Sequence, residues 1–502
     1  MGWRQELRPG LLSLFAGSLV TLSLAPYGIW PAAILSCCLY MGLLRTCPVR
    51  IAVLRGWLYG LGMFGSGASW VYVSIHDHGN AGVPLAVFLT GVFCAGLALL
   101  HALFALLYAR FLREAMAGML VGFPALWVLF EWLRSWLLTG FPWLYIGYAT
   151  LDTWADGWIP VIGVFGGSLL LAFSASCLYL AWMRRHVQAY LVYGTMVASL
   201  WLVGWQFQQA QWVARASDTP VGVAIVQPNI PQELKWRRDY YQPQLDIYEG
   251  LTTPLLGEDV VLWPEAAIPN YYQRAQDFLL PLARRAYDSG TALVTGIPWR
   301  PATDTRYYNS IVALARGEGV YHKQRLVPFG EYVPLEEWLR GMIDFFDLPM
   351  SAFSPGRPNQ QPLQLQDFRA APFICYEIVY PGLVREYARR ADLMITISND
   401  SWFGDSIGPL QHLQMARMRA LENGRYLLRG TNNGVSAIID ERGQVVAQSG
   451  QFTREILRGE AQVMLGQTPF SRLGSTPTLV LCGLLLVTVL GAGGMGLRLQ
   501  HN

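Results

Sequence analysis

Long apolar runs separated by short polar connections fill the first 210 residues, and one further run lies near the end of the chain. Each run is close to the roughly 20 residues that an α-helix needs to cross the apolar core of a membrane. The pattern therefore predicts about eight membrane-spanning helices. They cover residues 10–27, 29–44, 56–75, 83–109, 118–138, 159–183, 188–207 and 476–497.

The middle of the chain has the hydropathy of a water-soluble domain. Short runs rich in β-branched residues alternate there with helical patterns, which is typical of a layered α/β fold. The predicted strands cover 221–226, 259–263, 291–295, 309–315, 371–375 and 393–398, with helices at 277–288, 381–390 and 409–423 and a hairpin over 435–448. We therefore expect transmembrane helices 1–7 within residues 1–210, an α/β domain over 217–470, and a C-terminal transmembrane helix within 474–502.

The composition agrees with a membrane protein. Hydrophobic residues make up 53% of the chain and charged residues 14%, whereas a soluble protein carries about 25% charged residues. The net charge of +3 over 502 residues leaves no basic surface that would indicate nucleic-acid binding.

Arginines are concentrated in alternate connections between the apolar runs. If the N-terminus is inside, all of these clusters are cytoplasmic, as the positive-inside rule requires. The α/β domain lies between the seventh and eighth runs, so it then faces outward. The residues concerned are Arg4, Arg8, Arg45, Arg50, Arg55, Arg110, Arg113, Arg184, Arg185 and Arg498.

Three features of the apolar region have competing interpretations. His76 and His78 lack the further ligands of a metal site, so a solvated loop is the preferred interpretation. The aromatic residues of segment 141–158 fit either an interfacial belt or an arm that handles a lipid substrate. Glu131 and Arg134 lie three apart on one helical face and are expected to neutralise each other.

Of seven cysteines, Cys375 is the one that falls within residues 217–470. The α/β domain therefore cannot hold an internal disulfide. A lone thiol of this kind is either a buried structural group or a nucleophile.

Two chemically distinctive residues come at the ends of apolar strands, where α/β proteins build their sites. Glu265 follows one strand in Trp263-Pro264-Glu265, and Cys375 ends another in Cys375-Tyr376-Glu377. Lys323 precedes the motif Pro328-Phe329-Gly330-Glu331. Taken alone, Glu265 or Cys375 is weak evidence for a catalytic site, because most such glutamates lie on the surface and most lone cysteines lie in the core.

Together these segments resemble the nitrilase (carbon-nitrogen hydrolase) superfamily, whose members use a Glu-Lys-Cys triad in this chain order on a four-layer αββα sandwich. The motifs are similar to those of its bacterial membrane branch, the apolipoprotein N-acyltransferases. The resemblance to this branch extends along the whole chain. The resemblance implies that Glu265, Lys323 and Cys375 are catalytic.

The resemblance also implies the substrates. The acyl donor would be a membrane phospholipid, and the acceptor would be the α-amine of the N-terminal diacylglyceryl-cysteine of an apolipoprotein. The enzyme would be a multi-pass protein of the bacterial inner membrane with its catalytic domain in the periplasm, and we expect no metal and no cofactor.

Supporting positions follow from the same resemblance. Glu331 would assist the triad, Tyr376 and Glu377 would shape the pocket of the nucleophile, and Trp236 would lie on a loop at the substrate entrance. The role of Asn399 is left open. Apolar residues expected to line the cleft or to dip into the membrane are Phe329, Tyr332, Trp338, Phe345, Phe346 and Trp402.

The chemistry can be argued from the residues themselves. A thiol has a pKa of about 8.5 and needs a base or a cation to become a thiolate at neutral pH. Glu265 can be the base, and Lys323 can stabilise both the thiolate and an oxyanion. Attack on an ester would leave a thioester on Cys375, which an amine could then attack.

Three alternatives remain open. A membrane-tethered amidase or nitrilase would use the same triad, with water as acceptor, and would release free fatty acid instead of an amide. A Cys-His hydrolase would pair Cys375 with His322 or His412, but no third orienting residue is evident. A transporter or scaffold would tolerate the replacement of Cys375, and we find no internal repeats that favour it.

Overall fold

The computed structural model describes residues 3–79, 81–301, 306–328, 330–332 and 353–499. The chain divides into two compact units. The helical unit comprises Met1–Tyr72, Gly82–Gln211 and Leu473–Asn502. The α/β unit comprises Val73–Ala81 and Trp212–Arg472.

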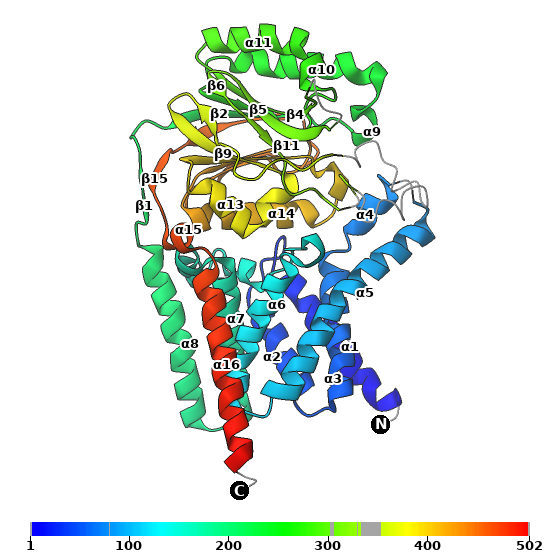
Figure 1. Ribbon diagram of the computed structural model, residues 1–502, viewed down its shortest axis with the longest axis vertical. Helices are drawn as coiled ribbons and strands as arrows, with labels where there is room; N and C mark the ends of the chain where they lie inside the picture. The colour runs from blue at the N-terminus through cyan, green and yellow to red at the C-terminus, as the bar shows by residue number, and fades with distance from the viewer. Residues whose placement is uncertain (1–2, 80, 302–305, 329, 333–352, 500–502) are drawn as a thin grey trace. The chain divides into compact units, whose positions relative to one another are not determined.

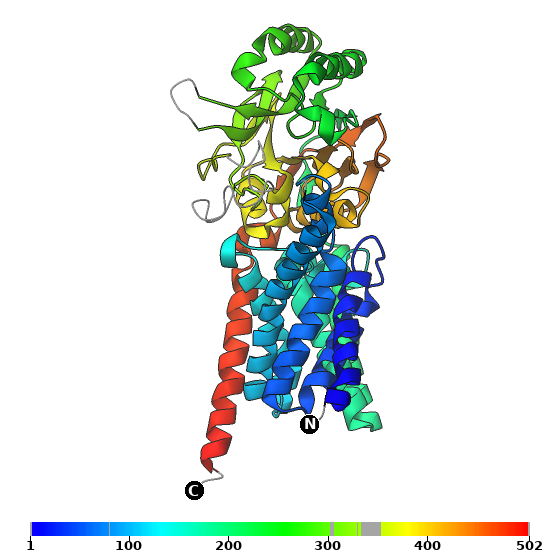
Figure 2. The ribbon, with the colours of Figure 1, turned by 90° about the vertical axis from the view of Figure 1, so that its right-hand side faces the viewer.

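Helices lie side by side in the helical unit, and both chain termini are at the same end of it (Figures 1 and 2). Small residues allow the close packing. A Cβ on Gly17 would lie 1.9 Å from the carbonyl oxygen of Tyr59, and one on Gly60 would lie 2.7 Å from the Cα of Ala98. The helices are α1 (Trp3–Leu22), α2 (Pro31–Arg45), α3 (Val49–Gly67), α5 (Val83–Leu107), α6 (Phe123–Arg134), α7 (Ile159–Arg184), α8 (Val187–Gln208) and α16 (Thr476–Leu499). The short helix α4 (Val71–His76) has its first two residues in this unit and the rest in the α/β unit.

Each predicted apolar run overlaps a helix, but the prediction of eight spans is not confirmed. Among the described residues, three helices are long and apolar enough to cross a membrane: Val83–Leu112, Trp154–Arg184 and Val187–Gln208. The α2 helix has 15 residues and α6 has 12, and at about 1.5 Å per residue both are shorter than an apolar core of about 30 Å.

The aromatic segment 141–158 is mostly part of the interior. Trp143 and Tyr145 are 0% exposed and Tyr148 is 1% exposed, whereas Trp154 is 53% exposed. The rings of Tyr145 and Tyr148 stack with their centroids 5.7 Å apart. The interpretation of the whole segment as an interfacial belt or a lipid-handling arm is therefore wrong, because its central aromatic side chains pack inside the helical unit.

Two large sheets form the centre of the α/β unit. In the described residues the first has the order β14-β2-β3-β4-β5-β7 and the second the order β13-β12-β11-β10-β9-β8-β6. The first consists of β2 (Val221–Gln227), β3 (Val260–Leu262), β4 (Ala292–Trp299), β5 (Tyr308–Ala315), β7 (Val320–His322) and β14 (Glu455–Ala461). The second consists of β6 (Gly317–Glu318), β8 (Leu363–Leu365), β9 (Phe368–Ile374), β10 (Leu393–Ser398), β11 (Leu427–Thr431), β12 (Ala437–Ile439) and β13 (Val445–Gln448), and a separate pair joins β1 (Val213–Arg215) to β15 (Met464–Gly466).

Helices cover the outer face of each sheet (Figure 1). The first sheet packs against α10 (Tyr241–Thr252) and α11 (Gln276–Asp288) through buried side chains such as Leu245, Leu279 and Val261. On the other side lie α13 (Pro381–Ala388) and α14 (Gly408–Asn423), and the short helices are α9 (Gln232–Lys235) and α15 (Pro469–Leu473). This arrangement confirms the predicted αββα sandwich.

The parallel strands decide where functional groups can gather. Strands β2, β3 and β4 run parallel in the first sheet, as do β9, β10 and β11 in the second. Their carboxyl ends deliver the segments that follow β3 and β9, which contain Glu265 and Cys375.

Candidate active site

Lys323 lies between two carboxylates. Its Nζ is 2.8 Å from Oε2 of Glu331 and 3.5 Å from Oε1 of Glu265. All three residues are buried, with exposed fractions of 1% for Lys323, 7% for Glu265 and 6% for Glu331. A cation in this position is attracted to both carboxylates with little screening by water.

Asn309 joins the same two carboxylates, which the sequence did not predict. Its Nδ2 donates to Oε1 of Glu265 at 2.7 Å and to Oε1 of Glu331 at 2.9 Å. Since a carboxylate only accepts hydrogen bonds, these two contacts fix the orientation of the amide. The backbone amides of Asn399 and Val327 complete the set, donating at 2.9 Å to the remaining oxygens of Glu265 and Glu331, respectively.

Cys375 begins the short 3₁₀ helix η10 (Cys375–Val379) directly after β9 and has a φ of 51°. The charges of Glu265 and Lys323 both act on the pKa of its thiol. The structure thus brings the three residues of the predicted triad into one electrostatically coupled group, although they come from separate loops.

Burial and nearby charges oppose ionisation of the resting thiol. Burial raises the pKa of the Cys375 thiol well above its ordinary value, Glu265 raises it further, and Lys323 opposes both. Burial alone would lower the pKa of Lys323, but the attraction to Glu331 and Glu265 outweighs it and raises the pKa above its ordinary value. A neutral thiol, a buried ammonium and a carboxylate are the starting point for general-base catalysis.

Glu377 ties the loop of Cys375 to the loop of Lys323. Its side chain is fully buried, and its carboxylate accepts hydrogen bonds from the amides of Ile374 at 2.9 Å and Gln324 at 2.7 Å and from the hydroxyl of Tyr321 at 2.8 Å. Burial raises its pKa to about 7, although the backbone hydrogen bonds oppose the shift. The neighbouring Tyr376 is 8% exposed and packs edge-on against another tyrosine ring.

Helix α9 connects Trp236 to this centre. Lys235, which is 2% exposed, donates from Nζ to the backbone oxygen of Glu265 at 2.9 Å. Gln232, at the start of α9, accepts a hydrogen bond from Nδ2 of Asn399 at 2.7 Å. Trp236 follows directly and is 36% exposed, so an exposed aromatic ring lies one residue from a direct contact with Glu265.

The loop of His76 and His78 is not simply solvated. Residues Val73–Ala81 belong to the α/β unit, and Nε2 of His78 is 2.7 Å from the backbone oxygen of Ser401. The loop is partly solvated, since the side chains of His76 and Asp77 are 34% and 52% exposed, and His78 in addition contacts the segment that follows Asn399. Of the apolar residues expected to line the cleft, Phe329, Trp338, Phe345 and Phe346 lie outside the described residues.

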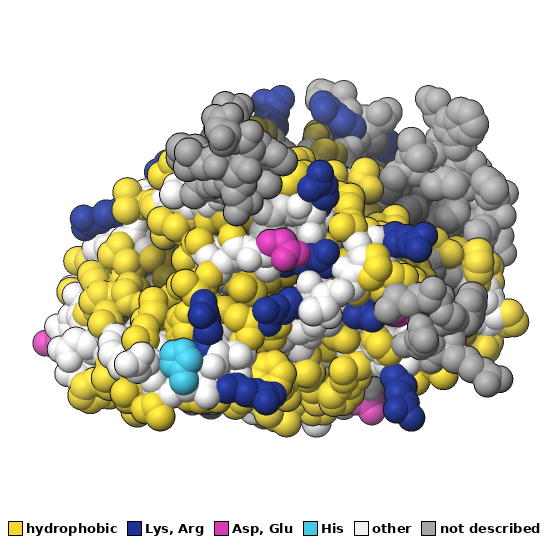
Figure 3. Space-filling model, turned by 90° about the horizontal axis from the view of Figure 1, so that it is seen from below, with side chains coloured by type: hydrophobic (Ala, Val, Ile, Leu, Met, Phe, Trp, Pro, Cys, Tyr) yellow, Lys and Arg dark blue, Asp and Glu magenta, His cyan; other side chains and the backbone are white. Residues whose placement is uncertain are grey.

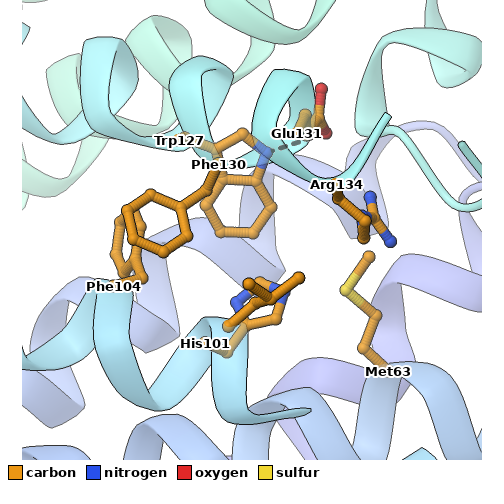
Figure 4. Close-up of a pocket in the computed structure, with 8 residues that line it drawn as sticks. Met63, His101, Phe104, Trp127, Phe130, Glu131 and Arg134 are labelled. Atoms are coloured by element: carbon orange, nitrogen blue, oxygen red, sulfur yellow. Dashed lines mark hydrogen bonds between the residues drawn. The ribbon is translucent and has the colours of Figure 1, made fainter. Parts of the chain in front are cut away.

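A separate polar cluster lies within the helical unit (Figure 4). His101, Glu131 and Arg134 line a small pocket there together with aromatic side chains. Glu131 accepts hydrogen bonds from the indole of Trp127 and from the amide of Ile146, both at 2.9 Å. Arg134 lies over two aromatic rings. These contacts stabilise the buried charges in addition to the mutual attraction predicted from the sequence.

Two family models match the chain. The carbon-nitrogen hydrolase model matches residues 222–470. The model of the apolipoprotein N-acyltransferase N-terminal domain matches residues 16–177. The first match lies in the α/β unit, and the second lies in the helical unit except for Val73–Ala81, which belongs to the α/β unit.

Curated relatives match nearly the whole chain. The apolipoprotein N-acyltransferase of Pseudomonas paraeruginosa is 46% identical over 504 residues, covering 98% of each chain. The protein of the same name from Azotobacter vinelandii is 47% identical and covers 95% of each chain. That from Coxiella burnetii is 40% identical, over 96% of this chain and 99% of its own.

Proposed function

The chain belongs to the apolipoprotein N-acyltransferase family, and we propose that it acylates lipoproteins through a thioester on Cys375. The acyl donor is a membrane phospholipid, and the acceptor is the α-amine of an N-terminal diacylglyceryl-cysteine. The observation that carries the proposal is the buried Glu265–Lys323–Glu331 cluster beside the thiol of Cys375.

In the first step Glu265 accepts the thiol proton while the sulfur of Cys375 attacks the ester carbon of the phospholipid. A C–S bond forms, and the negative charge that develops on the carbonyl oxygen is stabilised by the ammonium of Lys323. When the intermediate collapses, the C–O ester bond breaks. Glu265 then returns the proton to the departing lysophospholipid alcohol.

In the second step the α-amine of the lipoprotein attacks the thioester carbon, and Glu265 accepts a proton from the amine. The C–S bond breaks as the amide forms, and the proton passes to the sulfur of Cys375. The free enzyme is regenerated, and the product is a triacylated lipoprotein. The lysophospholipid leaves before the amine reacts with the acylated enzyme, which is a ping-pong mechanism.

The other predicted residues have supporting roles in this proposal. Glu331 anchors Lys323 through the 2.8 Å contact. Glu377 and Tyr376 shape the turn that carries the nucleophile. Trp236, exposed at the end of α9, would contact the incoming lipid or lipoprotein.

For the membrane arrangement we propose eight spans, helices 1–7 within 1–210 and the eighth within 474–502, with the catalytic domain of 217–470 in the periplasm. Contacts of the basic residues support one cytoplasmic end. Arg113 donates to the carbonyl of Leu44 at 2.8 Å, Arg45 contacts Met183, and Arg55 pairs with Glu6 at 2.9 Å. Figure 3 looks onto one end of the helical unit, where Arg side chains lie among hydrophobic ones. Such an end belongs on the inner face of a bacterial inner membrane.

An acyl-transfer assay on the purified full chain tests the function. Phospholipid and a synthetic diacylglyceryl lipopeptide are supplied, and both the amide product and free fatty acid are measured. We expect the amide to form with wild type and with Cys47→Ser, a control in the helical unit, and to be lost with Cys375→Ser. Release of fatty acid with an unchanged lipopeptide would instead indicate a hydrolase with water as acceptor.

A further inference from the structure

The backbone of Cys375 is held in a conformation that non-glycine residues rarely adopt. Its φ of 51° lies in the left-handed region, and such strain persists only where the surroundings maintain it. One contact acts directly on this peptide. Nε2 of His412, on α14, is 3.1 Å from the backbone oxygen of Cys375.

The partners of His412 determine which ring nitrogen holds Cys375. A carbonyl oxygen only accepts, so Nε2 must carry the proton that it shares with Cys375. Nδ1 lies between a donor and an acceptor, 3.2 Å from a guanidinium nitrogen of Arg429 and 3.5 Å from Oδ1 of Asp400. Burial and the charge of Arg429 lower the pKa of His412, and the hydrogen bond to Asp400 opposes the shift.

A buried ion pair fixes the ring in place. Arg429 donates to Oδ2 of Asp400 at 2.7 Å, and Ser398 donates to Oδ1 of the same carboxylate at 2.5 Å. The side chains of Asp400, Arg429 and His412 are each at most 1% exposed. This polar cluster has no place in the chemical steps described above, and burying it is costly unless its members are paired.

The same cluster also borders the general base. Asp400 directly follows Asn399, whose backbone amide donates to Oε2 of Glu265 at 2.9 Å. The turn at residues 399–400 thus contacts the base on one side and, through Arg429 and His412, the nucleophile on the other.

We propose that His412 is a positioning residue: it holds the carbonyl of Cys375 and thereby the turn that aims the thiol, with Arg429 and Asp400 holding the ring in place. This role rests on the proposed thioester chemistry. It also removes His412 from the role of base, because Nε2 already donates its proton to a carbonyl and Nδ1 is occupied by Arg429 and Asp400. The Cys-His alternative raised by the sequence therefore loses His412, and the other candidate, His322, is paired with Ser310 at 2.7 Å.

The test compares His412→Leu, which removes the donor, with His412→Gln, whose amide nitrogen can take the place of Nε2. His322→Gln is the matched control, since His322 is a half-buried histidine of the same unit. Full-length proteins in detergent are mixed with phospholipid. The rate of acyl-adduct formation on Cys375, the KM for phospholipid and the thermal unfolding temperature are measured for each.

We expect His412→Leu to slow adduct formation on the order of 10²-fold at unchanged KM, as a displaced nucleophile would, and His412→Gln to recover much of the rate. A His412→Leu protein that is folded and acylated at the wild-type rate would overturn the proposal. So would a His412→Gln protein as slow as His412→Leu, or a loss that follows only the folded fraction. If wild type itself forms no adduct on Cys375, the proposed function fails instead, and the two failures are thereby distinguished.

Discussion

Asn309 offers a direct test of how the two carboxylates are held. Its single NH₂ group donates to Glu265 at 2.7 Å and to Glu331 at 2.9 Å, and its side chain is buried. Truncation to alanine in Asn309→Ala removes both hydrogen bonds but leaves the residues of the predicted triad in the chain.

The magnitude follows from these contacts. Hydrogen bonds to charged groups contribute about 1.5–3 kcal/mol each, and water entering the vacated space restores part of the loss. We therefore expect the free energy of unfolding to fall by about 2–4 kcal/mol. Without the shared donor, Glu265 is drawn toward Lys323, which is now 3.5 Å away. A displacement of about 1 Å is enough to slow acylation on the order of 10²-fold.

The assay is rapid-quench measurement of Cys375 acylation by phospholipid, with thermal unfolding recorded on the same samples. Ser310→Ala is the matched control, because Ser310 is the next residue of β5 and its hydroxyl contacts His322 instead of the carboxylates. Its acylation rate should match wild type. The reasoning is refuted if Asn309→Ala acylates at the wild-type rate, or if Ser310→Ala loses as much rate as Asn309→Ala.

Two further predictions concern glutamates. Glu265→Ala should leave the α/β unit folded but slow acylation on the order of 10²–10⁴-fold, and unchanged pre-steady-state kinetics would remove Glu265 from the role of base. Burial raises the pKa of Glu377 from 4.5 to about 7, so between these values the folded protein binds a proton that the unfolded chain has released, and stability falls as the pH rises. The wild type loses about 3 kcal/mol of stability over this range. The unfolding temperature of Glu377→Gln relative to that of wild type should therefore rise between about pH 5 and about pH 8. A gap between the two unfolding temperatures that does not change with pH would contradict this.

Much of the α/β fold follows from local sequence. The strand predicted over 393–398 coincides with β10, and the helix predicted over 409–423 matches α14 within one residue. Strand β11 was missed because Arg429 interrupts its apolar pattern, and the burial of this arginine depends on Asp400, which lies 29 residues away in the chain. In the helical unit, hydropathy located the helices but not all of their lengths. The run predicted over 118–138 contains α6, which covers Phe123–Arg134.

The site was less accessible to local reasoning. The proposed triad came from motif resemblance. Asn309 and Lys235 were missed because their contacts with Glu265 are not local in sequence: Asn309 lies 44 residues from Glu265, and Lys235 lies 30 residues from it. Asn309 carried one local signal, a polar amide near the start of an otherwise apolar strand. Lys235 carried none, because a lysine in a polar segment usually lies on the surface.

Mass spectrometry of the intact protein after exposure to phospholipid tests the central claim most directly. The account predicts one acyl chain, located on Cys375 by peptide mapping and released by hydroxylamine at neutral pH, as expected for a thioester. A protein that transfers acyl chains to lipopeptide without ever carrying one on Cys375, or an adduct there that resists hydroxylamine, would contradict it.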